Sequence, residues 1–212
     1  MTLAPNNTPS LIAPSELPFN PDATPLKLGV MASGSGSNFE AIAQAIADRQ
    51  LNAKIHVLIY NNPDAKAAIR AAQWTIPAVL LNHRDFASRE ALDGAIVQTL
   101  REHDVEWVIM AGWMRIVTSR LIDAFPDRVI NIHPSLLPSF KGAHAIQQAF
   151  TAGVKITGCT VHLVQLEVDS GTILMQAAVP ILPDDTVETL QARIQVQEHR
   201  IFPPAIAIAA QL

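Results

Sequence analysis

The chain has 212 residues and a formal net charge of −4, and 49% of its residues are hydrophobic while 16% are charged. This balance excludes an intrinsically disordered chain, and the absence of a basic run argues against a nucleic-acid-binding protein. The single cysteine, Cys159, excludes an internal disulfide framework and fits a reducing, cytoplasmic location, and no apolar stretch reaches membrane-spanning length.

Residues 1–25 contain six prolines with polar residues between them, and they show neither a helical nor a strand period. We therefore expect a Pro-rich leader that is extended or disordered. It lacks the basic start and the continuous apolar core of a secretory signal. Residues 26–212 are expected to form a single domain, because no internal repeat or linker divides them.

Strands and helices alternate after the leader. The predicted strands cover residues 26–31, 54–60, 78–81, 106–111 and 129–132, and the predicted helices between them cover 37–49, 65–73, 86–103 and 119–125. This alternation predicts an α/β fold with a doubly wound, mostly parallel sheet. A helix at 145–151 then precedes two strands at 157–165 and 173–179. The short loop between these two strands predicts an antiparallel pair, so the sheet becomes mixed after the fifth strand. A last helix follows Thr186, and Pro203-Pro204 is expected to break it.

A turn rich in glycine and serine, residues 33–38, joins the first strand to the first helix. Gly34 and Gly36 relax the backbone there, and the free N–H groups of the following helix favour a phosphate. Ser37 and Glu40 have the spacing of a capping box. The turn is neither a full G-x-G-x-x-G nor a Walker A motif, so a single sugar phosphate fits better than a dinucleotide or a nucleoside triphosphate. The alternative is a tight turn that simply needs glycine.

Asn131 and His133 lie at the end of the fifth strand, immediately before Pro134. They are two residues apart, so their side chains project to the same face. Ligands of open α/β sheets bind outside the carboxyl ends of the strands, where an amide and an imidazole can together stabilise an oxyanion. The alternative is that His133 only bonds a nearby backbone group.

Two other segments are less informative on their own. Residues 111–116 leave the fourth strand and could line a slot, but on their own they are better explained by ordinary core packing at a strand end. Asp169 lies in a loop at 167–171 and would orient His133 if the two met. Their spacing does not show that they meet, and an Asp-Ser-Gly sequence is usually just a turn. We interpret Cys159 as a buried structural thiol.

Five segments, in this order, resemble the phosphoribosylglycinamide formyltransferases, folate-dependent enzymes of purine synthesis. They are residues 33–38, 111–115, 131–138, 158–162 with 169–171, and 197–199, and the resemblance covers about residues 26–204. The resemblance implies the formyltransferase fold with a Rossmann-like N-terminal half. It implies transfer of the formyl group of the co-substrate 10-formyltetrahydrofolate to the amine of 5′-phosphoribosylglycinamide, giving formylglycinamide ribonucleotide and tetrahydrofolate in de novo purine biosynthesis.

The resemblance also implies roles for individual residues. The catalytic trio would be Asn131, His133 and Asp169. The ribonucleotide would be bound by Gly36, Ser37, Asn38, Phe39, Glu40, Gln195, Val196, Gln197 and Glu198. The folate would be bound by Arg89, Met114, Arg115, Ile116, Val117, Asn131, Gln165, Leu166, Glu167, Val168 and Asp169. The chain departs from the usual pattern at Trp113, where Phe is usual, and at Thr172, where Pro is common, and both changes affect local loop shape.

No metal is expected, since the histidines lack metal-binding spacing. The expected partners are two small-molecule substrates, without nucleic acid or membrane, and the chain would act as a monomer or homodimer. A formyltetrahydrofolate hydrolase is the main alternative, because it shares the trio but normally carries an N-terminal regulatory domain that the leader cannot form. A methionyl-tRNA formyltransferase would need an RNA-binding domain and a basic surface. A non-catalytic nucleotide-binding module would leave the trio without a shared task.

Overall fold

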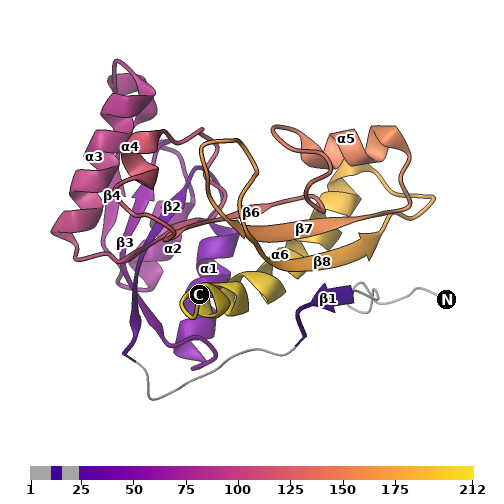
Figure 1. Cartoon of the computed structure of the whole chain (residues 1–212), viewed down its shortest axis with the longest axis horizontal. Coiled ribbons are helices and arrows are strands. Elements are labelled where there is room, and N and C mark those ends of the chain that lie inside the picture. Colours follow the sequence, from indigo (N-terminus) through magenta and orange to yellow (C-terminus); the bar gives the residue numbers. More distant parts are fainter. Residues whose placement is uncertain (1–10, 16–23) are drawn as a thin grey trace.

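The computed structural model describes residues 11–15 and 24–212, in which one eight-stranded sheet carries helices on both faces (Figure 1). The strands are β1 (Leu11–Ala13), β2 (Leu26–Ala32), β3 (Ala53–Tyr60), β4 (Ala78–Leu80), β5 (Trp107–Met110), β6 (Val129–His133), β7 (Ile156–Leu163) and β8 (Ile173–Pro180). The helices are α1 (Ser37–Ala47), α2 (Ala67–Gln73), α3 (Arg89–Glu102), α4 (Ser119–Ile122), α5 (Ala145–Ala152) and α6 (Val187–Ala209), with a short 3-10 turn at His83–Asp85.

The strand order in the sheet is β1-β8-β7-β6-β5-β2-β3-β4. Strands β2 to β6 pair in parallel, whereas β6 pairs with β7, and β7 with β8, in antiparallel fashion. The predicted change from a parallel to a mixed sheet after the fifth predicted strand is therefore confirmed. The chain moves to one side of β2 to form β3 and β4, and then to the other side to form β5. Such a reversal opens a crevice at the carboxyl ends of the strands.

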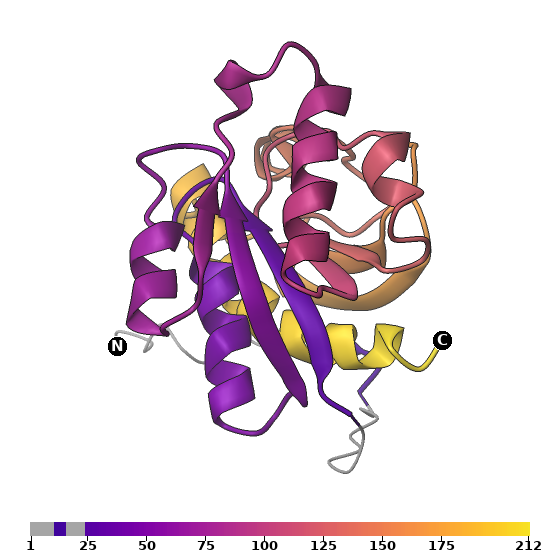
Figure 2. The same cartoon turned by 90° about the vertical axis from the view of Figure 1, so that its left-hand side faces the viewer.

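Each face of the sheet has its own hydrophobic core, because alternate residues of a strand point to opposite faces. Side chains of α1, α2 and α6 cover one face, where Leu28, Val30 and Ile109 are fully buried. Side chains of α3 and α4 cover the other, where Met31 and Val108 are fully buried (Figure 2). In β6, Ile130 and Ile132 join the first core and Val129 the second. The alternation places Asn131 and His133 on the face of Val129, beyond the cover of α3 and α4.

The last helix does not end at Pro203-Pro204, contrary to the sequence prediction, but continues to Ala209. Proline cannot donate to the preceding turn, so each of the two positions lacks one helical hydrogen bond. Phe202, Ala205 and Ile206 are fully buried beside these prolines, in the core that α1, α2 and α6 cover. Burial of this apolar stripe favours continuing the helix over ending it.

Part of the leader, which was predicted to be extended or disordered, forms a short extended strand. Leu11–Ala13 form β1, which pairs antiparallel with β8 at the edge of the sheet, and Ile12 packs against the core that α6 covers. The three residues are the only run of three apolar residues between the leader's prolines, and they are long enough for a short edge strand. The disordered-leader prediction for residues 1–10 and 16–23 lies outside the described residues.

Candidate active site

The antiparallel pairing of β6 with β7 brings four polar side chains onto one face. Asn131 lies opposite His162 and His133 lies opposite Thr160 across the two strands. The intervening residues Cys159 and Val161 point into the core on the other face. Sequence reasoning did not assign a role to His162, although the alternation of apolar and polar residues from Cys159 to His162 indicates that its side chain points to the face opposite Cys159 and Val161.

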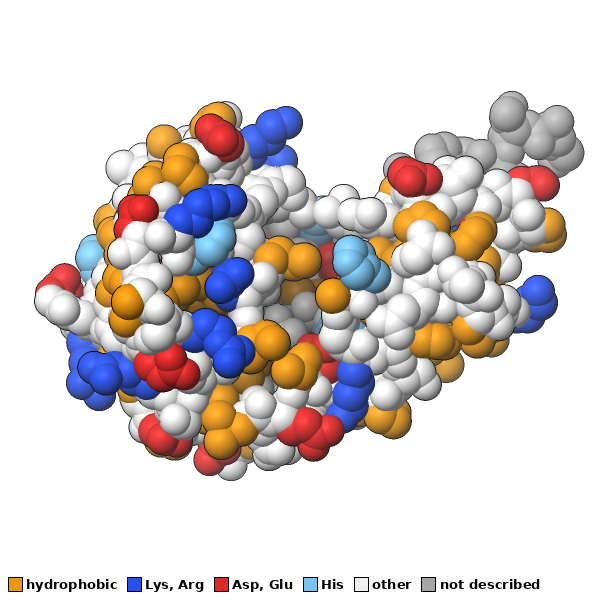
Figure 3. Space-filling model, turned by 90° about the horizontal axis from the view of Figure 1, so that it is seen from above, with side chains coloured by type: hydrophobic (Ala, Val, Ile, Leu, Met, Phe, Trp, Pro, Cys, Tyr) orange, Lys and Arg blue, Asp and Glu red, His pale blue; other side chains and the backbone are white. Residues whose placement is uncertain are grey.

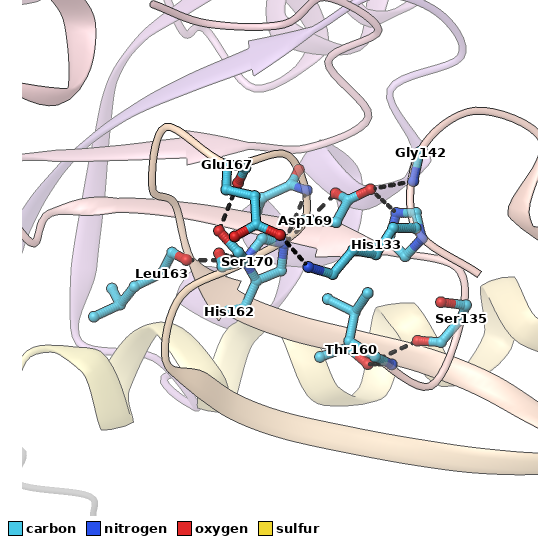
Figure 4. Close-up of polar contacts among 12 residues, drawn as sticks. His133, Ser135, Gly142, Thr160, His162, Leu163, Glu167, Asp169 and Ser170 are labelled. Atoms are coloured by element: carbon cyan, nitrogen blue, oxygen red, sulfur yellow. Dashed lines mark hydrogen bonds and ion pairs between the residues drawn. The ribbon is translucent and has the colours of Figure 1, made fainter. Parts of the chain in front are cut away.

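Asp169 meets His133 at the end of these strands (Figure 4). Its Oδ2 lies 3.3 Å from Nδ1 of His133 and accepts a 2.6 Å hydrogen bond from the backbone N–H of Gly142. Its Oδ1 lies 3.9 Å from Nε2 of His162. The carboxylate is 9% exposed and the His133 side chain 7% exposed, so both groups are largely shielded from solvent. The three residues that the resemblance implies to be catalytic therefore share one small volume.

The His133 ring has a partner at each nitrogen. Nε2 lies 2.9 Å from the carbonyl oxygen of Phe140, and Nδ1 faces Asp169. Both partners accept hydrogen bonds, so the ring is oriented from two sides. The alternative weighed from the sequence, a bond from His133 to a nearby backbone group, is thus also present.

A second group of side chains surrounds the glycine-rich turn. Asn38 donates through Nδ2 to Oε2 of Glu198 at 2.9 Å, and Gln195 donates through Nε2 to Ser37 Oγ at 2.9 Å. These bonds join α1 to α6 at the wall of the cleft. Glu198 is 9% exposed, and its burial raises the pKa of the carboxyl, with the bond from Asn38 opposing part of that rise.

Gly36 begins α1 with φ of 72°, a left-handed conformation that favours glycine. A Cβ at this position would lie 2.7 Å from Cα of Ala67, so the turn also packs directly on α2. The predicted capping box at Ser37 and Glu40 is wrong, because α1 has no side-chain cap. Ser37 instead accepts from Gln195, and Glu40 accepts from Trp74 at 3.0 Å and from Arg70 at 3.2 Å.

The loop after β5 is held at both ends. At one end the backbone N–H of Met114 donates to Oγ of Ser33 at 2.8 Å. At the other, Thr118 donates through its backbone N–H (2.6 Å) and its hydroxyl (2.8 Å) to the buried carboxylate of Asp93. Between these anchors, Met114 is 76% and Ile116 52% exposed. The exposed side chains of Met114 and Ile116 are therefore available to contact a ligand, while hydrogen bonds hold the backbone of the loop in place.

One cleft of about 1040 Å³ at the carboxyl edge of the sheet is lined by Asn131, His133, His162 and Asp169, by the turn at residues 34–38 and by the loop at residues 112–117. Figure 3 looks onto this edge and shows the face hollowed between its two sides, with hydrophobic side chains around the hollow. The cleft is large enough for two small ligands of several rings. Of the residues expected to bind ligands, its lining includes Gly36, Ser37, Asn38, Gln195 and Glu198, and also Arg89, Met114, Arg115, Ile116, Val117, Asn131, Gln165, Leu166, Val168 and Asp169.

Five of the expected binding residues are not among those lining the cleft. Phe39 is fully buried in the core, and Gln197 is 3% exposed and accepts from Arg200. Glu40 is engaged with Arg70 and Trp74, and Val196 is 50% exposed on α6. Glu167 pairs with Lys141 at 2.8 Å across the loops around Asp169. Four of the five adjoin a lining residue in sequence, and Glu40 lies two residues from Asn38.

Within the described part of the chain, no three His, Cys, Asp or Glu side chains gather in a way that could hold a metal ion. No helix among the described residues is long and apolar enough to cross a membrane.

The chain matches the family model described as formyl transferase over residues 26–206. The phosphoribosylglycinamide formyltransferase of Bacillus subtilis is 42% identical over 180 residues, which are 85% of this chain and 92% of that protein. A solved structure of glycinamide ribonucleotide transformylase 1 from Symbiobacterium toebii is similar with a TM-score of 0.85 and 43% identity, and covers 87% of each chain.

Some relatives are much longer. The trifunctional purine biosynthetic protein adenosine-3 of Drosophila melanogaster is 42% identical over 184 residues, which are 86% of this chain but only 14% of that protein. The chain thus spans a small fraction of these multifunctional relatives.

Proposed function

The chain belongs to the formyl transferase family, and we propose that it transfers a formyl group from 10-formyltetrahydrofolate to the amine of 5′-phosphoribosylglycinamide. The products are formylglycinamide ribonucleotide and tetrahydrofolate. The observation that carries this proposal is the convergence of Asn131, His133 and Asp169 in a cleft that the glycine-rich turn also lines. The names of the relatives that the chain covers over most of their length support the same reaction.

The two substrates are assigned to opposite parts of the cleft. We place the ribonucleotide phosphate at the turn around Gly36 to Asn38, where the N-terminus of α1 provides backbone N–H groups. Gln195 and Glu198 would contact the same substrate from α6. We place the folate against Met114 to Val117 and Gln165 to Val168, with Arg89 nearby, since these loops offer exposed apolar side chains. The formyl carbon then lies near His133.

The reaction begins when the neutral amine of the ribonucleotide attacks the formyl carbon on the folate nitrogen. A tetrahedral intermediate with an oxyanion forms, and the Asn131 amide and a protonated His133 would donate to that oxygen. In the resting geometry both His133 nitrogens face acceptors, Asp169 and the Phe140 carbonyl. The oxyanion must therefore replace one of these acceptors.

The proton balance gives Asp169 its role. The attacking nitrogen loses a proton and the leaving folate nitrogen gains one as the carbon–nitrogen bond to the folate breaks. A carboxylate 3.3 Å from His133 would orient the ring and carry this proton, directly or through water. No other reactant is consumed. The reaction as proposed uses two small molecules, needs neither nucleic acid nor a membrane, and is expected of a cytoplasmic enzyme acting as a monomer or homodimer.

The proposal is tested by following the absorbance change of the folate with and without the ribonucleotide. We expect turnover only when both substrates are present, with formylglycinamide ribonucleotide appearing in equal amount to the tetrahydrofolate. Turnover at the same rate without the amine would identify a hydrolase instead, and no turnover in either case would reject formyl transfer.

A further inference from the structure

His162 lies beside Asn131 and Asp169 but has no role in the proposed formyl transfer. Its side chain is 2% exposed, and its ring is enclosed between β6, β7 and the loop that carries Asp169. Nδ1 lies 2.9 Å from the carbonyl oxygen of Leu163 and 3.0 Å from that of Ser170 (Figure 4). Carbonyl oxygens only accept hydrogen bonds, so Nδ1 must carry a proton.

The other nitrogen, Nε2, then carries a lone pair whenever the ring is neutral. Burial lowers the pKa of His162, while the two carbonyls and Asp169 oppose this shift. The charged or titratable side chains that face the ring are Asp169, whose Oδ1 lies 3.9 Å from Nε2, and His133, whose charge also disfavours a second proton. The neutral ring with its proton on Nδ1 is therefore the favoured form.

The side-chain nitrogen of Asn131 lies 3.2 Å from Nε2 of His162. A lone pair on Nε2 can only accept, so the part of the amide that faces it must be the NH₂ group and not the carbonyl oxygen. The orientation of the Asn131 amide is thus inferred from the proton on Nδ1 of His162. It does not depend on distinguishing the amide nitrogen from the amide oxygen by their positions alone. One N–H of Asn131 is thus used by His162, and its second N–H remains for the cleft.

We propose that His162 is a positioning residue, which orients the Asn131 amide so that an N–H and not the carbonyl oxygen is offered to the oxyanion. This inference rests on the proposed function, because it concerns the oxygen of the transferred formyl group. The chain of contacts runs from the carbonyls of Leu163 and Ser170, through the tautomer of His162, to the amide of Asn131.

The orientation has a large effect on the reaction because the two ends of an amide have opposite polarity. An N–H stabilises a developing negative charge, whereas a carbonyl oxygen in the same place repels it. Without an acceptor at the position of Nε2, the Asn131 amide can turn over by rotating about its last side-chain bond. A proton on Nε2 would have the same effect, since two donors would then face each other.

Two substitutions of His162 separate this role from simple support of the loop. An asparagine amide reaches the position of Nδ1, so His162→Asn keeps a donor to Leu163 and Ser170 but loses the acceptor for Asn131. A glutamine amide reaches the position of Nε2, so His162→Gln keeps an acceptor for Asn131. We expect His162→Asn to lower kcat by about tenfold or more, with KM values within about twofold of wild type, because the loss concerns only the transition state. We expect His162→Gln to recover most of that loss.

The matched control is His56, a partly buried histidine outside the cleft whose Nδ1 also lies 2.8 Å from a backbone carbonyl, that of His103. The Asn and Gln variants of His56 should both turn over like wild type. If His162→Asn is as active as His162→Gln, or more active, the residue supports the loop and the proposal is wrong.

A second readout needs no substrate. The nitrogen chemical shifts of the His162 ring, measured by NMR in the wild-type protein, should identify the neutral form with its proton on Nδ1 at neutral pH. A proton on Nε2 at neutral pH would overturn the proposal even if the enzyme were active. Because this measurement is independent of turnover, failure of the proposed function and failure of this inference can be told apart.

Discussion

At the scale of single residues, the buried side chains of His133 and Asp169 are each held by two partners. His133 lies between Asp169 and the Phe140 carbonyl, and Asp169 in turn accepts from Gly142. These partners restrict the rotation of the His133 and Asp169 side chains, so the ring and the carboxylate are held in one relative orientation. Such preorganisation lets fixed dipoles stabilise charge without reorganising during the reaction.

The clearest structural ion pair outside the cleft joins Asp185, just before α6, to Arg193. Two guanidinium nitrogens donate to the carboxylate at 2.5 and 2.8 Å, and Leu182 and Thr189 donate to it as well. Mainly because of the bonds from Arg193, the pKa of Asp185 is lowered from 3.8 to about 2. A lowered pKa stabilises the fold fully above the unfolded value, and this contribution is lost as the pH falls from about 4 to about 2.

We predict that Asp185→Asn lowers the free energy of unfolding at neutral pH by about 2 kcal/mol, which corresponds to a fall in Tm of roughly 4–8 °C. The variant should also lose less stability than wild type between pH 4 and pH 2. Thermal unfolding at several pH values measures both effects. The neighbouring Asp184 is exposed, and Asp184→Asn should leave Tm nearly unchanged. Equal Tm values for the two variants would contradict this account of the pair.

At the scale of elements, the backbone conformation at the start of α1 requires glycine at position 36 but not at position 34. Gly36 has φ of 72°, and a Cβ there would lie 2.7 Å from Cα and 2.8 Å from Cβ of Ala67. Gly34 has no atom within 4 Å of the position of a Cβ. The turn is therefore shaped by its contact with α2, which sequence spacing alone does not reveal.

We predict that Gly36→Ala destabilises the protein by about 1–3 kcal/mol, because it combines a left-handed backbone with a close contact to backbone atoms. Gly34→Ala should change stability by less than about 1 kcal/mol. Denaturant unfolding of the two variants makes the comparison. The expectation fails if both glycines tolerate alanine equally.

The edge strand β1 gives a second matched pair. Ile12 packs against the core, whereas its neighbour Leu11 is 73% exposed. Ile12→Asp should release β1 from β8, because a carboxylate at the core face is costly to bury. Leu11→Asp should leave the pairing intact. Amide hydrogen exchange along Gln176 to Ala178, which pair with β1, measures the release at those N–H groups that point to β1 and not to β7. Fast exchange in wild type would show that β1 does not cover this edge in solution.

The elements that sequence alone predicts well are those with a local pattern. The alternation of strands and helices from Leu26 to Asn131 follows from apolar periods, and the observed elements match it closely. One prediction fails, and one strand was not predicted, where distant packing decides the structure. The prolines at 203 and 204 do not end α6, because its neighbouring side chains are buried under the sheet. Leu11–Ala13 form a strand because the edge of β8 is available beside them.

At the scale of the whole molecule, the cleft is made by residues far apart in the sequence. Ser33 bonds Met114, Asn38 bonds Glu198 and Asp169 meets His133. The shared face of Asn131 and His133 follows from strand periodicity alone. The approach of Asp169 and His162 depends on the antiparallel register of β6 with β7, which spacing cannot supply. The resemblance to a known family predicted a catalytic role for Asp169, but it assigned no role to His162.

The most direct test of the account is a double-mutant cycle on kcat with wild type, His133→Ala, Asp169→Asn and the double variant. We predict that each single substitution lowers kcat by roughly a hundredfold or more, since each removes stabilisation made in the transition state. Because His133 and Asp169 are proposed to act as one unit, the double variant should be about as active as the weaker single variant. A loss equal to the product of the two single losses would mean that the residues act independently, and would contradict the central claim.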